Sequence, residues 1–156
     1  MRLTLTPIGR SHLVAALVVG VVGCAGGPLS TRIEGTSPVA APDAFACVRD
    51  QLKAVEFSQS SYDADELRVT ARKFDDQQRR PDVQFRRIVD RLEIDVGPGS
   101  GDALTNITVD AKTFAELTTQ RGPTESQEKT SETALSAAQT ILQKCSRPVD
   151  SLSVPG

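Results

Sequence analysis

Residues 83–117 carry the pattern that most restricts how this chain can fold. Apolar and polar residues alternate on both sides of a segment rich in Gly and Pro, GPGSGD at 97–102. A period of two places one face of a strand against a core, and the Gly/Pro segment marks a turn. The parity of the alternation changes near Arg86 and Arg87, and one extra residue there restores it as a β-bulge. The pattern therefore predicts a long antiparallel hairpin with a bulge in its first strand.

Two shorter strands are predicted before this hairpin. Val55, Phe57 and Gln59 alternate with polar residues, which indicates a strand at about 55–60. After a turn at YDAD, a second alternating run begins at Leu67 and continues to residue 72. The polar segment DDQQRRPD at 75–82 then reads as a loop that joins two strands.

Helical spacing of apolar residues appears at both ends of the folded region. Residues 44–54 form an amphipathic pattern after Asp43, which is a plausible N-cap because its carboxylate can accept from free amides. Near the other end, Gly122-Pro123 predicts the end of the sheet, and Thr124 with Gln127 matches a capping box. The stripe that follows predicts a second helix ending near Lys144 and Pro148.

The predicted order is therefore α–β–β–β–(β)–α. Helices with one apolar stripe and strands with one apolar face pack as two layers. We expect a single α+β domain at residues 43–147, in which two antiparallel helices cover one face of an antiparallel sheet of three or four strands. Residues 24–42 are rich in Gly, Pro, Ser and Ala and read as a flexible tether, and residues 148–156 as a disordered tail.

The N-terminus has the composition of a secretory signal. Arg2 and Arg10 precede an apolar run of ten residues, Leu13 to Val22. No acidic residue occurs before Glu34. A membrane-spanning helix needs about 20 apolar residues, so this run is too short to span. The four residues Val21-Val22-Gly23-Cys24 resemble the lipobox of bacterial lipoproteins.

This resemblance implies that residues 1–23 are a signal peptide and that Cys24 becomes the N-terminus with a diacylglycerol on its sulfur. The lipid would anchor the protein in the cell envelope, since two acyl chains hold a protein stably on a membrane. Ala25 is not an inner-membrane retention signal, so we expect the outer membrane in a cell with two membranes. The alternative is ordinary cleavage nearby, for instance after Ala25, which would release a soluble secreted domain.

Assigning Cys24 to the lipid leaves two cysteines, Cys47 and Cys145. An even number of cysteines in an exported protein predicts a disulfide, and a bridge across about 100 residues stabilises by roughly 4.7 kcal/mol in the chain-entropy model. Such a bridge would place the two helices side by side and antiparallel. The alternative is two buried free thiols.

Composition argues against several classes of function. Removal of residues 1–23 leaves 16 basic and 20 acidic side chains, a net charge of −4, which does not suit non-specific nucleic-acid binding. The sole histidine, His12, lies in the signal, so the mature chain has no imidazole for a Ser-His-Asp or typical zinc site. We therefore expect a protein that is not an enzyme and has no cofactor or metal.

Five arginines lie close together in the sequence around one predicted hairpin. They could meet an anionic partner or surface, although nearby Asp residues make a solvated face the alternative. We therefore hypothesise an envelope lipoprotein that binds a protein partner, with a small-ligand carrier or sensor as the alternative. The five residues are Arg79, Arg80, Arg86, Arg87 and Arg91.

Overall fold

The computed structural model describes residues 29–99 and 105–146. The predicted signal peptide, Cys24, the second half of the GPGSGD turn and the C-terminal tail lie outside these residues. Within them, no helix is long and apolar enough to cross a membrane.

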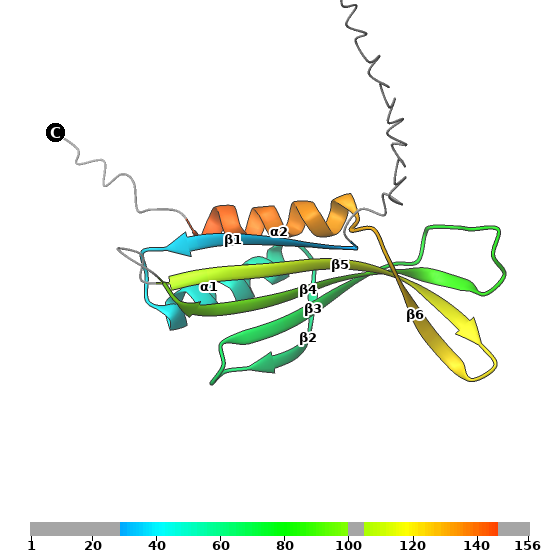
Figure 1. The fold of residues 1–156 in the computed structure, drawn as a ribbon, viewed down its shortest axis with the longest axis horizontal. Helices are drawn as coiled ribbons and strands as arrows, with labels where there is room; N and C mark the ends of the chain where they lie inside the picture. Colours follow the sequence, from blue (N-terminus) through cyan, green and yellow to red (C-terminus); the bar gives the residue numbers. More distant parts are fainter. Residues whose placement is uncertain (1–28, 100–104, 147–156) are drawn as a thin grey trace, which may run out of the picture.

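The described chain is an α+β fold with one antiparallel sheet and two helices, as predicted, but the sheet has six strands rather than three or four. The strands follow the order β1-β5-β4-β3-β2, and β6 pairs separately with β5. Both helices pack on the same face of the sheet (Figure 1). The elements are β1 (Ser30–Ser37), α1 (Ala41–Ala54), β2 (Ser58–Asp63), β3 (Arg68–Asp75), β4 (Phe85–Pro98), β5 (Thr105–Thr119), β6 (Gly122–Glu128) and α2 (Glu132–Cys145).

The predicted long hairpin is confirmed as β4 and β5, which pair from Phe85↔Leu117 to Pro98↔Thr105. The register shifts between Phe85 and Arg87, so the bulge also lies where the change of parity predicted it. Two boundaries differ from the prediction. Val83 is in the preceding loop and 98% exposed, and β4 continues through Gly97 and Pro98.

β5 has two successive partners along one of its edges, since β4 occupies the other. Its first half, up to Lys112, pairs with β1, and its second half, from Thr113 to Thr119, pairs with β6. Because β5 continues past its pairing with β1, the sheet extends beyond the helices.

The prediction that residues 24–42 form a flexible tether is wrong for residues 30–37, and residues 24–28 lie outside the described residues. Residues 30–37 form β1, an edge strand of the sheet. Its sequence, STRIEGTS, has only Ile33 as a large apolar residue, because an edge strand over a small part of the core needs little apolar surface. Pairing with β5 supplies its backbone hydrogen bonds, and Arg32 adds an ion pair with Asp110.

The predicted start of the second helix is also wrong. Gly122 and Pro123 begin β6 instead of ending the sheet; Gly122 has a φ of 110°, which turns the chain from β5 into β6. Pro123 is tolerated because β6 is an edge strand. The helix N-cap is Ser131, whose Oγ accepts from the amide of Ala134.

The first helix begins earlier than predicted. α1 starts at Ala41 after an N-cap at Ala40, so Asp43 lies in the first turn and is not the cap. Pro42 fits there because the first turn of a helix leaves its amides unpaired, and an acidic residue suits the positive end of the helix. The two early strands begin later than predicted. β2 begins at Ser58, and Leu67, with a φ of 49°, belongs to the turn before β3.

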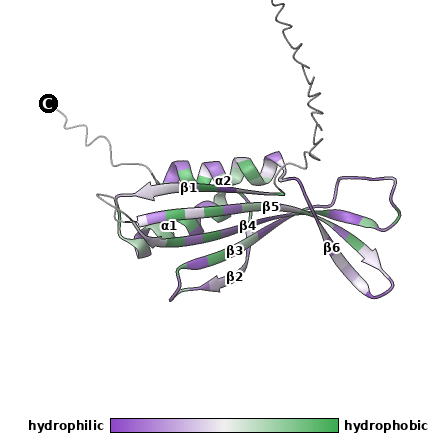
Figure 2. Cartoon of the chain, viewed as in Figure 1, coloured by the Kyte–Doolittle hydropathy of each residue, from purple (hydrophilic) through white to green (hydrophobic). Residues whose placement is uncertain are grey.

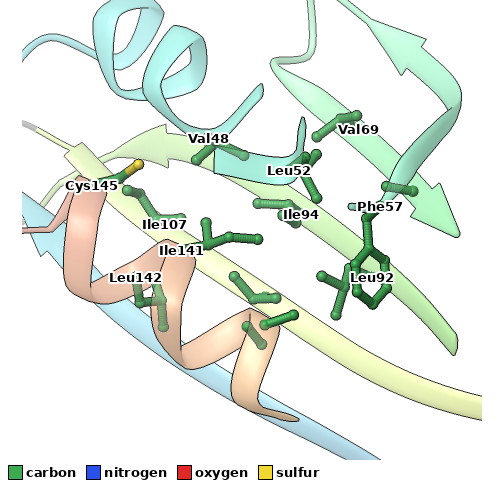
Figure 3. Packing of buried hydrophobic residues seen from close by; sticks show 14 of the residues in the cluster. Val48, Leu52, Phe57, Val69, Leu92, Ile94, Ile107, Ile141, Leu142 and Cys145 are labelled. Carbon is green, nitrogen blue, oxygen red and sulfur yellow. The ribbon is translucent and has the colours of Figure 1, made fainter. Parts of the chain in front are cut away.

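The core lies between the helices and the sheet (Figure 3). It contains nineteen buried residues, among them Val48, Leu92, Ile94 and Ile141. The predicted disulfide between Cys47 and Cys145 is present and joins the middle of α1 to the last residue of α2. Figure 1 shows the two helices running in opposite directions, so the bridge and the antiparallel helices agree.

Candidate functional site

One end of the sheet extends beyond both helices. We call this part, formed by residues 74–90 and 113–128, the arm; Figure 1 shows it to the right of α2. It comprises β6, the adjacent halves of β4 and β5, and the loop that joins β3 to β4, which is mostly hydrophilic in Figure 2. A buried carboxylate lies where the arm meets the helix-covered part of the sheet. Asp90 accepts hydrogen bonds from the hydroxyls of Thr113 and Ser131 at 2.6 and 2.7 Å.

Side chains on the face opposite the helices form an apolar row at the root of the arm. Phe74, Val89 and Phe114 are direct cross-strand partners on β3, β4 and β5. Their parity is opposite to that of the core residues Ala71, Leu92 and Ala111, so they project from the helix-free face. We call this the open face. Val89 is fully buried there, and Phe74 is 45% exposed.

Two arginines lie on the rings of this row. The guanidinium of Arg87 is 3.9 Å from the centroid of Phe74, and that of Arg91 is 4.4 Å from the centroid of Phe114. Cation–π contacts of this kind contribute roughly 0.5–2 kcal/mol each. They also restrict each guanidinium to a position over its ring. The open face thus combines aromatic rings with ordered arginines, and we call these four residues with Val89 the arginine–phenylalanine surface.

Carboxylates on neighbouring strands orient these arginines. Arg91 donates to Glu125 of β6 at 2.6 Å, and Arg87 donates to Glu116 of β5 at 3.1 Å. Glu116 also accepts from Arg86 at 2.7 Å, and its side chain is only 9% exposed. One buried carboxylate therefore serves two guanidinium groups.

The structure places the five predicted arginines in three different surroundings. Arg87 and Arg91 belong to the arginine–phenylalanine surface, and Arg86 joins Arg87 at Glu116. Arg80 pairs with Glu128 and lies 4.6 Å from the ring centroid of Phe85. Arg79 donates to the backbone carbonyls of Asp76 and Gln78. Four of the five are therefore paired with carboxylates, so they do not form one free cationic patch.

The Arg80–Glu128 pair also has the clearest effect on titration in the arm. Hydrogen bonding from Arg80 lowers the pKa of the Glu128 carboxyl below its ordinary value of 4.5, although partial burial opposes the shift. The same pair raises the pKa of Arg80. Both groups are therefore charged at neutral pH.

Sequence reasoning missed a row of three cations next to the apolar row. Arg72 of β3 lies directly opposite Arg91 of β4, which lies opposite Lys112 of β5. Lys112 pairs with Glu93 at 2.6 Å, whereas Arg72 takes part in none of the ion pairs found among the described residues. The alternation at 67–72 predicted that Arg72 faces away from the core; the cross-strand register alone showed its cationic neighbours.

A solvent-open hollow at the root of the arm, on the helix side, has a volume of about 450 Å³. Its lining is mostly polar and includes Lys73, Asp75, Asp90 and Ser131. Within residues 29–99 and 105–146, no group of three or more His, Cys, Asp or Glu side chains has the geometry to hold a metal ion. The acidic residues Asp63 and Asp75 accept hydrogen bonds from nearby backbone amides, as turn residues do.

Comparison with known proteins does not assign this chain to a family: no family model and no curated protein matches it. Functional inference therefore depends on the geometry of the open face and on the sequence.

Proposed function

We propose that this protein is a lipid-anchored, non-enzymatic module of the cell envelope that binds a protein partner through the arginine–phenylalanine surface. The observation that carries the proposal is the placement of aromatic rings and ordered guanidinium groups on a sheet face that neither helix covers. Aromatic residues and arginine are enriched at protein interfaces and among the residues that dominate binding energy.

The surface suits binding because its side chains are already held in place. Arg87 and Arg91 each contact a ring and a carboxylate, so they lose little rotational freedom when a partner binds. The half-buried carboxylate of Glu125 supplies a polar border next to Arg91, and the buried carboxylate of Glu116 holds Arg87 in place. This is the arrangement of an interface with an apolar centre and charged surroundings.

The sequence supports the anchor, and the short segment between Cys24 and β1 limits how far the folded domain can lie from the lipid. Five residues separate Cys24 from Ser30, and an extended chain spans about 3.5 Å per residue, so Ser30 would lie within roughly 21 Å of the lipidated cysteine. Ser30 pairs with Lys112, next to the root of the arm. The proposed surface would therefore remain near the membrane, within reach of other membrane-bound proteins.

The alternative of a small-ligand carrier receives less support from the structure. Ligand sites are mostly apolar cavities with a few polar groups. The space between the helices and the sheet is filled by the nineteen core residues, and the hollow of about 450 Å³ at the root of the arm has a mostly polar lining.

Photocrosslinking in intact cells tests the proposed surface. A photoreactive amino acid replaces Phe74 in the full chain, and a matched control replaces Tyr62, which is 44% exposed but lies on the helix side of β2. We expect the probe at position 74 to capture a protein that the probe at position 62 does not capture. Equal capture at both positions, or none above an unrelated lipoprotein, would contradict the proposal.

Intact-mass analysis tests the anchor separately. The mature chain should begin at an acylated Cys24, and Cys24→Ala should block processing. A mature chain that begins elsewhere without a lipid would leave the secreted domain as the correct alternative.

A further inference from the structure

The cationic row on the open face contains hydrogen-bond donors that lack acceptors. The Nε atoms of Arg72 and Arg91 are both buried and have no hydrogen-bond partner within the described residues. A buried donor left without an acceptor destabilises the folded protein. Both atoms belong to arginines that face each other directly across β3 and β4.

Like charges directly opposite each other also destabilise a sheet. The neighbouring carboxylates only partly offset this arrangement, since one of them pairs with Arg91 and none pairs with Arg72. Glu93 accepts from Lys112, Glu125 accepts from the Nη2 of Arg91, and Asp110 accepts from Arg32. Arg72 is left without a carboxylate among the described residues, directly opposite Arg91. Because the two Nε atoms are buried, an external acceptor can reach these guanidinium groups only at their Nη atoms.

We propose that Arg72 and Arg91 bind a carboxylate side chain of the protein partner, so that the partner presents an acidic segment to the open face. A carboxylate accepts hydrogen bonds on two oxygens and offsets the repulsion between the two guanidinium groups. This inference rests on the proposed function, because it takes its ligand from a partner at the same surface.

The neighbouring apolar row defines the rest of the contact. Phe74 lies two residues beyond Arg72 on β3 and projects from the same face, about 7 Å further along the strand. The partner segment that fits this face therefore carries an acidic side chain next to an apolar one. Its carboxylate lies over Arg72 and Arg91, and its apolar side chain contacts Phe74.

A fluorescently labelled glutamate homopeptide is the probe for the carboxylate site, with a glutamine homopeptide of the same length as its neutral control. Its anisotropy is titrated with the full mature chain in uncharged detergent micelles at low ionic strength. Arg72→Gln should weaken binding by roughly tenfold or more, because hydrogen bonds to charged groups contribute about 1.5–3 kcal/mol. The glutamine peptide should bind weakly to every variant.

Arg32→Gln is the matched control. Arg32 has the same charge and lies on the same face, but it pairs with Asp110 and its side chain is 64% exposed. This substitution should change peptide affinity by less than about threefold. Arg72→Lys keeps the charge without the planar fork and should bind with intermediate affinity. Circular dichroism of each variant shows whether the fold is retained, and only folded variants are compared.

Several outcomes would overturn this inference. Equal peptide binding by Arg72→Gln and Arg32→Gln would show that Arg72 does not contribute to binding. Binding of the glutamine peptide as tight as that of the glutamate peptide would show that the peptide's charge does not matter. Arg72-dependent binding to phosphatidylglycerol vesicles that is tighter than binding to the peptide would assign the site to a lipid phosphate. Capture at position 74 without Arg72 dependence would retain the proposed function and refute this site. Arg72-dependent peptide binding without capture would support a carboxylate site at Arg72 and contradict the proposed protein partner.

Discussion

The helix-covered part of the sheet and the arm are built from the same two long strands, yet different interactions stabilise them. Under the helices, nineteen buried residues form one core, which the Cys47–Cys145 disulfide closes. In the arm, the buried apolar residues are Ile88, Val89 and Ala115, which lie outside that core cluster. Ion pairs and arginine–aromatic contacts supply the rest, mostly between side chains of β4, β5 and β6.

The two parts should therefore differ in their free energy of unfolding. Buried apolar area gives the helix-covered part most of its free energy of folding, since burial contributes about 25 cal/mol per Å². Exposed ion pairs contribute little, about 0–1 kcal/mol each. We therefore expect the arm to open locally at a lower free energy than the core, as regions with few buried apolar contacts do. Four changes test this comparison.

The largest effect is expected from Leu92→Ala. Leu92 is fully buried in the core, and truncating a buried leucine costs about 2–5 kcal/mol because it leaves a cavity. Urea denaturation should show a lower midpoint for the whole domain. Val89→Ala in the arm is compared with Val109→Ala in the core, because both valines are fully buried and both changes remove two methyl groups; the change in the arm should cost less. A larger cost for Val89→Ala would reverse the comparison.

Removal of the disulfide should come next. Replacing both Cys47 and Cys145 with Ala should lower the free energy of unfolding by about 2–4 kcal/mol, because the bridge restricts the unfolded chain across a separation of 98 residues. Thermal or urea unfolding measures the loss, and non-reducing peptide mapping should first show the linked peptides in the native protein. Two free thiols in that map would contradict the bridge itself.

Glu116→Gln should loosen the arm without affecting the core. The substitution removes the charge that holds Arg86 and Arg87, and the local loss should be about 1–3 kcal/mol because the carboxylate is largely buried. Hydrogen exchange should speed up at residues 85–89 and 113–119 but not at 92–96. Asp110→Asn, which breaks the exposed pair with Arg32, should have little effect. Uniformly faster exchange would show that the two parts open together.

The smallest effect is expected from pH. Because the pKa of Glu128 is lower in the folded protein than its ordinary 4.5, its pair with Arg80 stabilises the arm above that pH. This contribution is lost as the pH falls through the folded pKa. The partly exposed pair should contribute less than about 1 kcal/mol. Hydrogen exchange in β6 at pH above and below 4.5 measures it. Glu128→Gln should remove this part of the pH dependence, and an unchanged profile in that variant would assign the effect to other carboxyls.

Local patterns in the sequence were sufficient for the elements that face the core. The hairpin at 83–117, its bulge and the two amphipathic helices were predicted because burial on one face imposes a period on the sequence. The same patterns misassigned β1 and β6. These edge strands bury little apolar surface, and pairing with β5 stabilises them; for β1 that partner is distant in sequence. The run at Thr124–Gln127 had the residues of a capping box, but pairing with β5 determined its conformation.

The α+β class, the pairing of Cys47 with Cys145 and the approximate place of the arginine-rich segment could all be predicted from the amino-acid sequence. Which side chains meet could be seen only in the folded protein. Cross-strand register set Arg72 against Arg91, and the extension of β5 past the helices left the Phe74–Phe114 row on an open face. The physical reason is that periodicity depends on local burial, whereas register and strand order depend on contacts between residues that are far apart in the chain.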